Sequence, residues 1–252
     1  MSQSFLSKFR GRRAWLAIVL PAWVLAGFLL AEGLVIVLFH GLGAAGVNLS
    51  LVNPNVLDAL ASLLVYVFAL LIVIGLPWKL KKYRTTKADL ALETQPAMID
   101  FLLAPVGFVI YIVLSGILVA VAPHILPFVD LNQAQDTGFS GLTQPFEYVV
   151  AFLMLIVIAP VAEEVLFRGY LLGKLRHHVP TWAAILITSA LFGLVHFNWS
   201  VSIDVFALSI VLCLLRVRTN RLWPGVFLHM IKNALAFYLL FINPALLSTL
   251  GG

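Results

Sequence analysis

Long apolar runs separated by short polar segments dominate this sequence of 252 residues. A helix needs about 20 apolar residues to cross the hydrocarbon core of a bilayer. Seven runs meet this criterion, and they lie at residues 14–39, 58–78, 101–122, 147–173, 181–197, 201–215 and 222–242. The pattern therefore predicts an all-α fold, a polytopic transmembrane helical bundle of about seven spans.

The composition supports the same class. Hydrophobic residues make up 62% of the chain and charged residues 11%, whereas soluble proteins are about half apolar and a quarter charged. The longest loops, 79–100 and 123–146, are too short for a soluble domain, although a short interfacial helix is expected around Ala88–Glu93. We expect a single membrane domain over residues 1–252. Cys213 is the only cysteine, so neither an intramolecular disulfide nor a cysteine metal cluster can form.

The basic residues predict the topology. Fourteen of the 16 Lys and Arg residues lie in the N-terminal tail and in the segments 79–87, 174–176 and 216–221. Seven alternating spans place all four segments on one face, which the positive-inside rule makes cytoplasmic. We therefore expect a multi-pass protein of the plasma membrane with a cytoplasmic N-terminus and a first span retained as an anchor. The net charge of +5 then reflects topology, and no nucleic-acid partner is expected.

Polar residues inside the last spans form three motifs. They read E-E-x-x-x-R, F-x-x-x-H and H-x-x-x-N, and their polar members are Glu163, Glu164, Arg168, His196, His229 and Asn233. Polar groups inside a membrane are costly, so they are functional candidates by default. At 1.5 Å per residue, those of the three spans lie roughly 12–24 Å from the basic ends, in the middle of a core about 30 Å thick. We therefore expect them to meet in one layer.

Such a set of groups suits hydrolysis. A buried carboxylate and an imidazole, Glu163 and His196, can hold a water molecule and remove its proton. His229 and Asn233 could then donate hydrogen bonds to the oxyanion, each contributing about 3–4 kcal/mol. Alternatively, Glu163, His196 and His229 could bind zinc and leave its fourth position to water. The sequence leaves both versions open.

The two adjacent glutamates are expected to differ. Arg168 lies four residues from Glu164 and five from Glu163, so the helical i,i+4 pair is Glu164 with Arg168. Glu163 is then the free, reactive carboxylate, while Glu164 compensates the buried guanidinium group. We interpret Glu32 and Asp204, which lie in or near other spans, as structural residues.

In this order and on apolar helices, the three motifs resemble the CAAX protease and bacteriocin-processing family of intramembrane proteases. The resemblance covers about residues 147–241, the expected catalytic core, and no part of the first three spans. It implies that Glu163 and His196 activate water and that His229 and Asn233 hold the oxyanion. The implied activity is an endopeptidase, metal-assisted if zinc is bound. Its substrate would be a peptide or protein in the lipid bilayer: a prenylated CAAX-like, leader-peptide or membrane-protein segment.

Two other classes of function remain open from the residues. One is a non-enzymatic binding or immunity module that keeps the fold and uses the polar cluster to hold a partner. The other is a proton-coupled transporter, which would also need buried Glu and His. Against transport, the sequence has no pair of Gly/Pro-broken helices in symmetric halves. The sequence does not indicate an oligomeric state.

Overall fold

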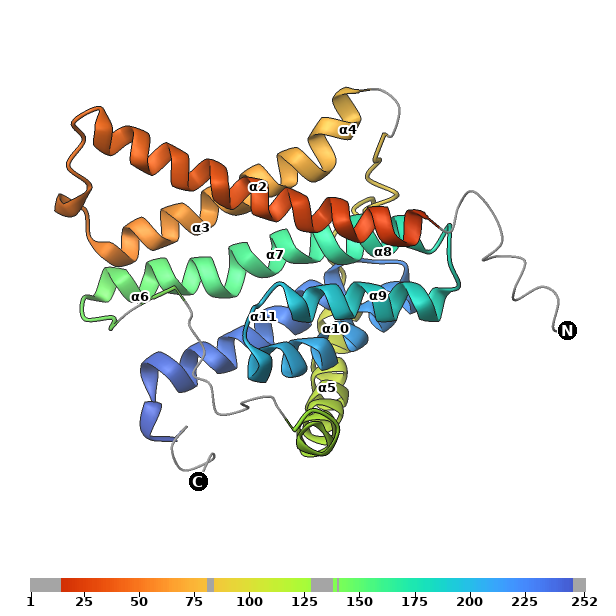
Figure 1. Ribbon diagram of the computed structural model, residues 1–252. Coiled ribbons are helices and arrows are strands. Elements are labelled where there is room, and N and C mark those ends of the chain that lie inside the picture. Colours follow the sequence, from red (N-terminus) through yellow and green to blue (C-terminus); the bar gives the residue numbers. More distant parts are fainter. Residues whose placement is uncertain (1–14, 81–83, 128–137, 140, 247–252) are drawn as a thin grey trace, which may run out of the picture.

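The structure is a computed structural model, and it describes residues 15–80, 84–127, 138–139 and 141–246. All regular elements of these residues are helical (Figure 1). The helices are α2 (Leu16–Ala44), α3 (Pro54–Leu70), α4 (Leu76–Lys79), α5 (Met98–Ile125), α6 (Pro145–Phe152), α7 (Ala159–Glu164), α8 (Leu172–Leu175), α9 (Thr181–Leu194), α10 (Trp199–Thr219) and α11 (Trp223–Phe237). A short 3₁₀ turn, Leu49–Leu51, precedes α3. Four π-helical segments continue or join these helices: Leu71–Gly75, Leu153–Ile158, Val165–Leu171 and Tyr238–Ile242.

Six helical stretches of the described residues are long and apolar enough to cross a membrane: Leu16–Ala44, Pro54–Lys79, Met98–Ile125, Pro145–Leu175, Trp199–Thr219 and Trp223–Ile242. The seventh apolar helix, α9, has 14 residues and is about 21 Å long, which is less than the thickness of the hydrocarbon core. Together they confirm the all-α fold with about seven spans.

The predicted span 181–197 is wrong at its C-terminal end. Helix α9 stops at Leu194, and the next helix begins at Trp199. The chain reverses between them because Asn198 caps α10: its side chain accepts a hydrogen bond from the Val201 N–H. The turn is closed further by the Ser202 hydroxyl group, which donates to the Gly193 carbonyl over 2.8 Å. Local capping therefore shortens this helix.

The helix with the two glutamates is the central element of the bundle. Helices α2 and α3 form a hairpin that packs along one side of Pro145–Leu175, while α9 and α11 contact its other side (Figure 1). Helix α5 is seen nearly end-on in Figure 1 and packs against α10 and α11. Side chains from both halves of the chain therefore meet around the central helix.

The outer surface of α5 is apolar, as expected for a helix that faces lipid. Large hydrophobic side chains that are more than half exposed follow one another along it: Leu102, Val106, Val109, Ile110, Val113 and Ile117. A soluble protein would not expose a continuous apolar face of this kind.

The basic segments of the described residues come together at one end of the bundle. Lys174 forms an ion pair with Asp89 (3.3 Å), and Arg221 forms another with Asp100 (2.6 Å). The N-terminal tail residues Lys8, Arg10, Arg12 and Arg13, as well as Lys81 and Lys82, lie outside the described residues. This arrangement agrees with a shared face for the described basic segments, while the side of the membrane remains a prediction.

The loop at this end contains turns and no helix over Ala88–Glu93, so the expected interfacial helix is wrong. Ala91 has a φ of 55°, in the left-handed region, which ends the first turn. The loop instead packs against the ends of the spans. A Cβ atom on Gly173 would lie only 2.8 Å from the Asp89 carbonyl oxygen, so the close approach depends on glycine there.

Candidate active site

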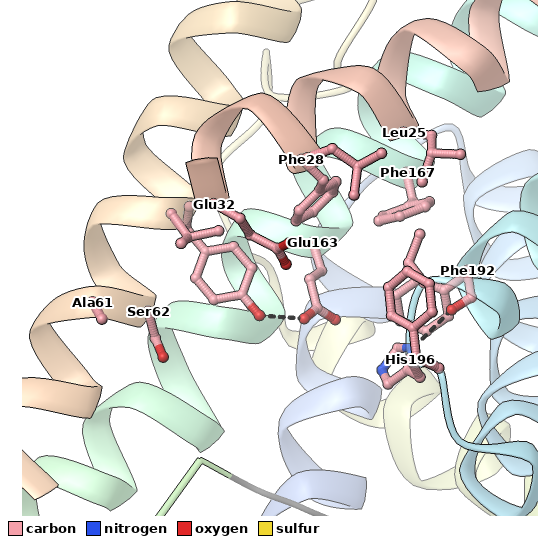
Figure 2. Close-up of a pocket in the computed structure, with 14 residues that line it drawn as sticks. Leu25, Phe28, Glu32, Ala61, Ser62, Glu163, Phe167, Phe192 and His196 are labelled. Atoms are coloured by element: carbon pink, nitrogen blue, oxygen red, sulfur yellow. Dashed lines mark hydrogen bonds between the residues drawn. The ribbon is translucent and has the colours of Figure 1, made fainter. Parts of the chain in front are cut away.

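Glu163 faces a cavity of about 340 Å³ between α2, α3, the central helix and the turn after α9. Its lining residues include Tyr66, Glu163, Phe192 and His196 (Figure 2). The walls are mainly apolar side chains, such as Phe28 on α2, so a carboxylate and an imidazole share mostly hydrophobic surroundings. Apolar walls lower the local dielectric constant and so strengthen the electrostatic interactions between the polar groups.

The two glutamates occupy different environments, as the spacing predicted. The side chain of Glu163 is 14% exposed and lines the cavity, whereas that of Glu164 is fully buried. Glu164 forms the expected ion pair with Arg168, with 2.8 Å between Oε1 and Nη1, and neither side chain is exposed. The pairing prediction is confirmed. A buried pair of opposite charges avoids the large cost that either charge would carry alone.

Tyr66 on α3 donates a hydrogen bond of 2.5 Å to Oε1 of Glu163 (Figure 2). A bond of this kind to an ionised acceptor is short and strong, and it fixes the direction of the carboxylate. The other oxygen, Oε2, lies 3.8 Å from His229 Nε2. This distance is too long for a hydrogen bond, so Oε2 and Nε2 both keep capacity for a third group.

His229 is held between the two glutamates. Its Nδ1 lies 3.1 Å from Oε1 of Glu164. An ionised carboxylate can only accept, so Nδ1 carries the proton in this bond. Gly225, one turn earlier on α11, packs against the same carboxylate, because a Cβ atom there would lie 3.1 Å from Oε2 of Glu164. Glu164 therefore orients His229 as well as compensating Arg168.

His196 lies on the turn that follows α9, and not within the helix as the spacing of four residues suggested. Its Nδ1 still reaches back to the Phe192 carbonyl oxygen, over 2.7 Å. Because a carbonyl group only accepts, Nδ1 is the protonated nitrogen and Nε2 of the neutral ring is the free acceptor. This tautomer leaves Nε2 able to take a proton from water.

The aromatic residue of the second motif connects the site. The Phe192 ring lies 4.3 Å from the Arg168 guanidinium carbon, a cation–π contact. Its ring centroid lies 5.1 Å from that of His196 and 5.9 Å from that of His229, both in edge-on contacts. Together with the carbonyl bond to His196, these contacts give a physical reason for F-x-x-x-H: phenylalanine packs between both imidazoles and the buried arginine.

Asn233, which we expected to hold the oxyanion, forms a hydrogen bond with the backbone of the central helix. Its Nδ2 donates a hydrogen bond of 2.8 Å to the Leu155 carbonyl oxygen. Leu155 belongs to the π-helical segment Leu153–Ile158, where the i→i+4 ladder is interrupted and carbonyl groups become available to other donors. In this arrangement Asn233 links α11 to the central helix. One amide hydrogen is used in this bond. The second could still donate to the oxyanion, so the predicted role of Asn233 remains a prediction.

The three residues proposed as zinc ligands do not form a metal-binding group in this structure. No set of three His, Cys, Asp or Glu side chains among residues 15–80, 84–127, 138–139 and 141–246 is arranged to hold a metal ion. Nδ1 of His229 is bonded to Glu164, so only Nε2, which lies 3.8 Å from Oε2 of Glu163, could bind a metal. The ligand set Glu163, His196 and His229 therefore does not fit a metal as arranged.

Comparison with known proteins bears directly on this region. The family described as "Type II CAAX prenyl endopeptidase Rce1-like" matches residues 145–235. The resemblance to the CAAX protease and bacteriocin-processing family is confirmed. The matched segment runs from the start of α6 into α11 and contains Glu163, Glu164, Arg168, His196, His229 and Asn233. It overlaps the expected catalytic core, residues 147–241, whose limits remain a prediction.

Curated relatives resemble only part of the chain. "Putative membrane peptidase YdiL" of Bacillus subtilis is 33% identical over 84 residues, which is 32% of this chain and 34% of that protein. "UPF0177 protein YxdF" of Lactococcus lactis is 30% identical over 100 residues, or 39% of this chain and 54% of that protein. The chain thus covers about a third to a half of the length of these relatives. No solved structure matches the chain.

Sequence reasoning missed what the first two spans contribute. Tyr66 and Ser62 on α3, and Leu25, Phe28 and Glu32 on α2, line the same cavity as the family motifs. Glu32, which we interpreted as purely structural, therefore lies at the candidate site. A signal was available for Tyr66: it stands in the middle of an apolar span, whereas membrane tyrosines usually lie at the interfaces.

Asp204, the other acidic residue interpreted as structural, lies outside this cavity. It accepts hydrogen bonds from Tyr111 (2.7 Å) and Ser115 (2.6 Å) on α5. Its second oxygen is 3.6 Å from the ammonium group of Lys232. These contacts hold α5, α10 and α11 together, which is consistent with a structural role.

Proposed function

We propose that this chain is an intramembrane endopeptidase in which Glu163 and His196 activate a water molecule for attack on a peptide carbonyl group. The observation that carries the proposal is the placement of a carboxylate and an imidazole with a free acceptor nitrogen in one mainly apolar cavity. The match of residues 145–235 to the family model and the name of the relative YdiL support a membrane peptidase. The six long apolar helices support action within a bilayer.

In the proposed reaction, water lies between Glu163 and Nε2 of His196. Glu163 takes its proton as the oxygen attacks the carbonyl carbon, and the same proton can later pass to the leaving amine. Tyr66 holds Oε1 of Glu163, which leaves Oε2 to face the reacting groups. A carboxylate fixed in this way needs less reorganisation when the reaction occurs.

His229 is the proposed donor to the oxyanion. Because its Nδ1 donates to Glu164, Nε2 can donate only when the ring is doubly protonated. Nε2 has no hydrogen bond to a described residue that would have to break first. In this scheme His229 enters the reaction with both ring nitrogens protonated, so no proton has to be supplied to it during the reaction. Arg168 balances Glu164, and Asn233 fixes the distance between α11 and the central helix.

Comparison of membrane proteomes tests the proposal. Cells that carry the intact chain and cells that carry Glu163→Gln at equal membrane abundance are compared for new protein termini. We expect termini that occur only with the intact chain, and their sequences would assign the substrate among prenylated C-termini, leader peptides and membrane-protein segments. Identical sets of termini, combined with a phenotype that survives in Glu163→Gln cells, would instead support a binding or immunity module.

A further inference from the structure

A second polar cavity, of about 320 Å³, lies at the basic end of the bundle. It is formed where α8, α9 and α10 meet the loop that precedes α5, and it shares no lining residue with the candidate active site. Its lining includes Asp89, Arg176, His177, Thr181, Arg216 and Asn220. Two arginines therefore line one cavity. Figure 1 shows the place in the fold where α8 leads into α9.

Arg216 carries a buried positive charge that no described carboxylate compensates. Only 4% of the residue is exposed. Its Nη1 donates to the Asn220 side-chain oxygen over 2.7 Å, and its Nη2 donates to the Asp89 carbonyl oxygen over 3.4 Å. Both acceptors are neutral, and Nε is buried without a partner among the described residues. A buried charge in this state is costly unless an anion approaches it.

The other walls of the cavity also suit an anion. Arg176 follows the end of α8 and forms no ion pair with the described residues. Thr181 is the first residue of α9, whose N-terminus has Pro180 as its cap and no side-chain acceptor. The N-terminal end of a helix carries partial positive charge and binds phosphate groups readily. This helix end thus reinforces the two guanidinium groups.

The single carboxylate in the lining does not cancel these charges. Oδ2 of Asp89 accepts a hydrogen bond from the Thr86 N–H (2.8 Å) and lies 3.3 Å from the Lys174 ammonium group. The Asp89 carboxylate therefore already pairs with Lys174, a cation outside the cavity lining. It forms an ion pair with neither Arg176 nor Arg216. Guanidinium groups are well suited to phosphate, because their planar N–H donors can bind two oxygens at once.

We propose that this cavity binds a phosphate group through Arg176, Arg216 and the first turn of α9. The group could come from a phospholipid head group or from free phosphate, which share this chemistry. Arg216 lies three residues before the end of the apolar helix α10, at Thr219, and therefore close to the membrane interface expected at that end of the span. Basic pockets between spans are known binding places for anionic head groups.

The test measures the thermal unfolding of the purified full-length chain in detergent. The probes are dioctanoyl phosphatidylglycerol, its phosphatidylcholine counterpart and inorganic phosphate. We expect phosphatidylglycerol to raise the unfolding midpoint in a saturable manner, with an apparent affinity weakened at least ~10-fold by Arg216→Gln and by Arg176→Gln. Arg218→Gln is the matched control: it removes an exposed arginine two residues away that does not line the cavity, and it should respond like the unaltered chain.

The outcomes separate the sources of the phosphate. An equal response to inorganic phosphate at the same concentration would assign the site to free phosphate, whereas a response to phosphatidylglycerol alone would assign it to lipid. If no probe shifts the midpoint, or if both cavity variants respond as Arg218→Gln does, the proposal is wrong. Should Arg216→Gln fail to fold, Arg176→Gln alone decides, because that residue is only partly buried. None of these measurements depends on peptidase activity.

Discussion

The Tyr66 hydroxyl group donates a hydrogen bond of 2.5 Å to Glu163, a residue 97 positions further along the chain. This bond connects α3 to the central helix, and thus joins the N-terminal spans to the part of the chain that matches the family. The first half of the protein therefore contributes to the candidate site through a direct contact with its central carboxylate.

We expect Tyr66→Phe to lower peptidase activity by about 10-fold or more, because a hydrogen bond to a charged group is worth roughly 1.5–3 kcal/mol. The apolar ring remains, so folding should change little. Tyr148→Phe is the control: it also removes a hydroxyl group that is bonded to the protein, here to the Leu142 carbonyl oxygen, but away from the cavity. Turnover and the unfolding midpoint of both variants would be compared. Equal turnover of the two would contradict a role for Tyr66.

The two glutamine variants should differ in their effects on activity and on the unfolding midpoint. Glu163→Gln keeps the size of the side chain but removes the base, so activity should fall at least ~10²-fold with a nearly unchanged unfolding midpoint. Glu164→Gln should lower the midpoint as well as activity, because it leaves the buried Arg168 charge uncompensated. Glu93→Gln, on an exposed loop, is the control for loss of a carboxylate. A stable, inactive Glu164→Gln beside an active Glu163→Gln would show that the roles are reversed.

His229 allows the metal-free and metal-assisted versions to be distinguished. If it donates to the oxyanion, His229→Gln should lower turnover by roughly 10²–10³-fold with no change in metal content. If it is a ligand, the same variant should lose metal from the purified protein. We expect the first outcome, since the described side chains of Glu163, His196 and His229 are not arranged to hold a metal ion. Elemental analysis with and without chelator, with exposed His124→Gln as control, checks it; stoichiometric zinc whose removal stops cleavage would overturn the metal-free scheme.

Asn233→Ala should reduce both stability and activity. It removes the hydrogen bond to the Leu155 carbonyl oxygen, and an unsatisfied polar group costs about 1–3 kcal/mol. We therefore expect a lower unfolding midpoint together with a loss of turnover of about 10²-fold. A loss of turnover at an unchanged midpoint would instead indicate that Asn233 acts mainly on the oxyanion, as its spacing from His229 suggested.

Topology can be tested with reporter fusions. The described basic segments meet at one end of the bundle, around Asp89 and Lys174, and we expect this end to be cytoplasmic. Reporters fused after Arg176 and after Gly252 should then report opposite sides of the membrane. If both report the same side, the number of crossings after Arg176 is not the three that we expect. In that case α9, the shortest of the seven apolar stretches among the described residues, would be the first candidate for a helix that does not cross the membrane.

The sequence by itself determined the fold class and which polar residues are functional candidates. Apolar runs long enough to span a bilayer leave few alternatives to helices, because backbone groups in lipid must be bonded within the chain. The pairing of Glu164 with Arg168 also followed from sequence, since it depends only on the local geometry of a helix. Helical spacing is sufficient to predict an interaction when both residues lie on the same continuous helix.

Only the tertiary structure decided how the elements face one another. Spacing placed His196 on a helix, but capping by Asn198 moved it to a turn. Spacing also paired Asn233 with His229, yet a π-helical segment of another span offers Asn233 the Leu155 carbonyl group. The contact of Tyr66 with Glu163 depends on the rotation and depth of two separate helices. Helix packing in the membrane fixes the rotation and the depth of each helix. Neither can be predicted from hydrophobic periodicity when the span is apolar on all sides.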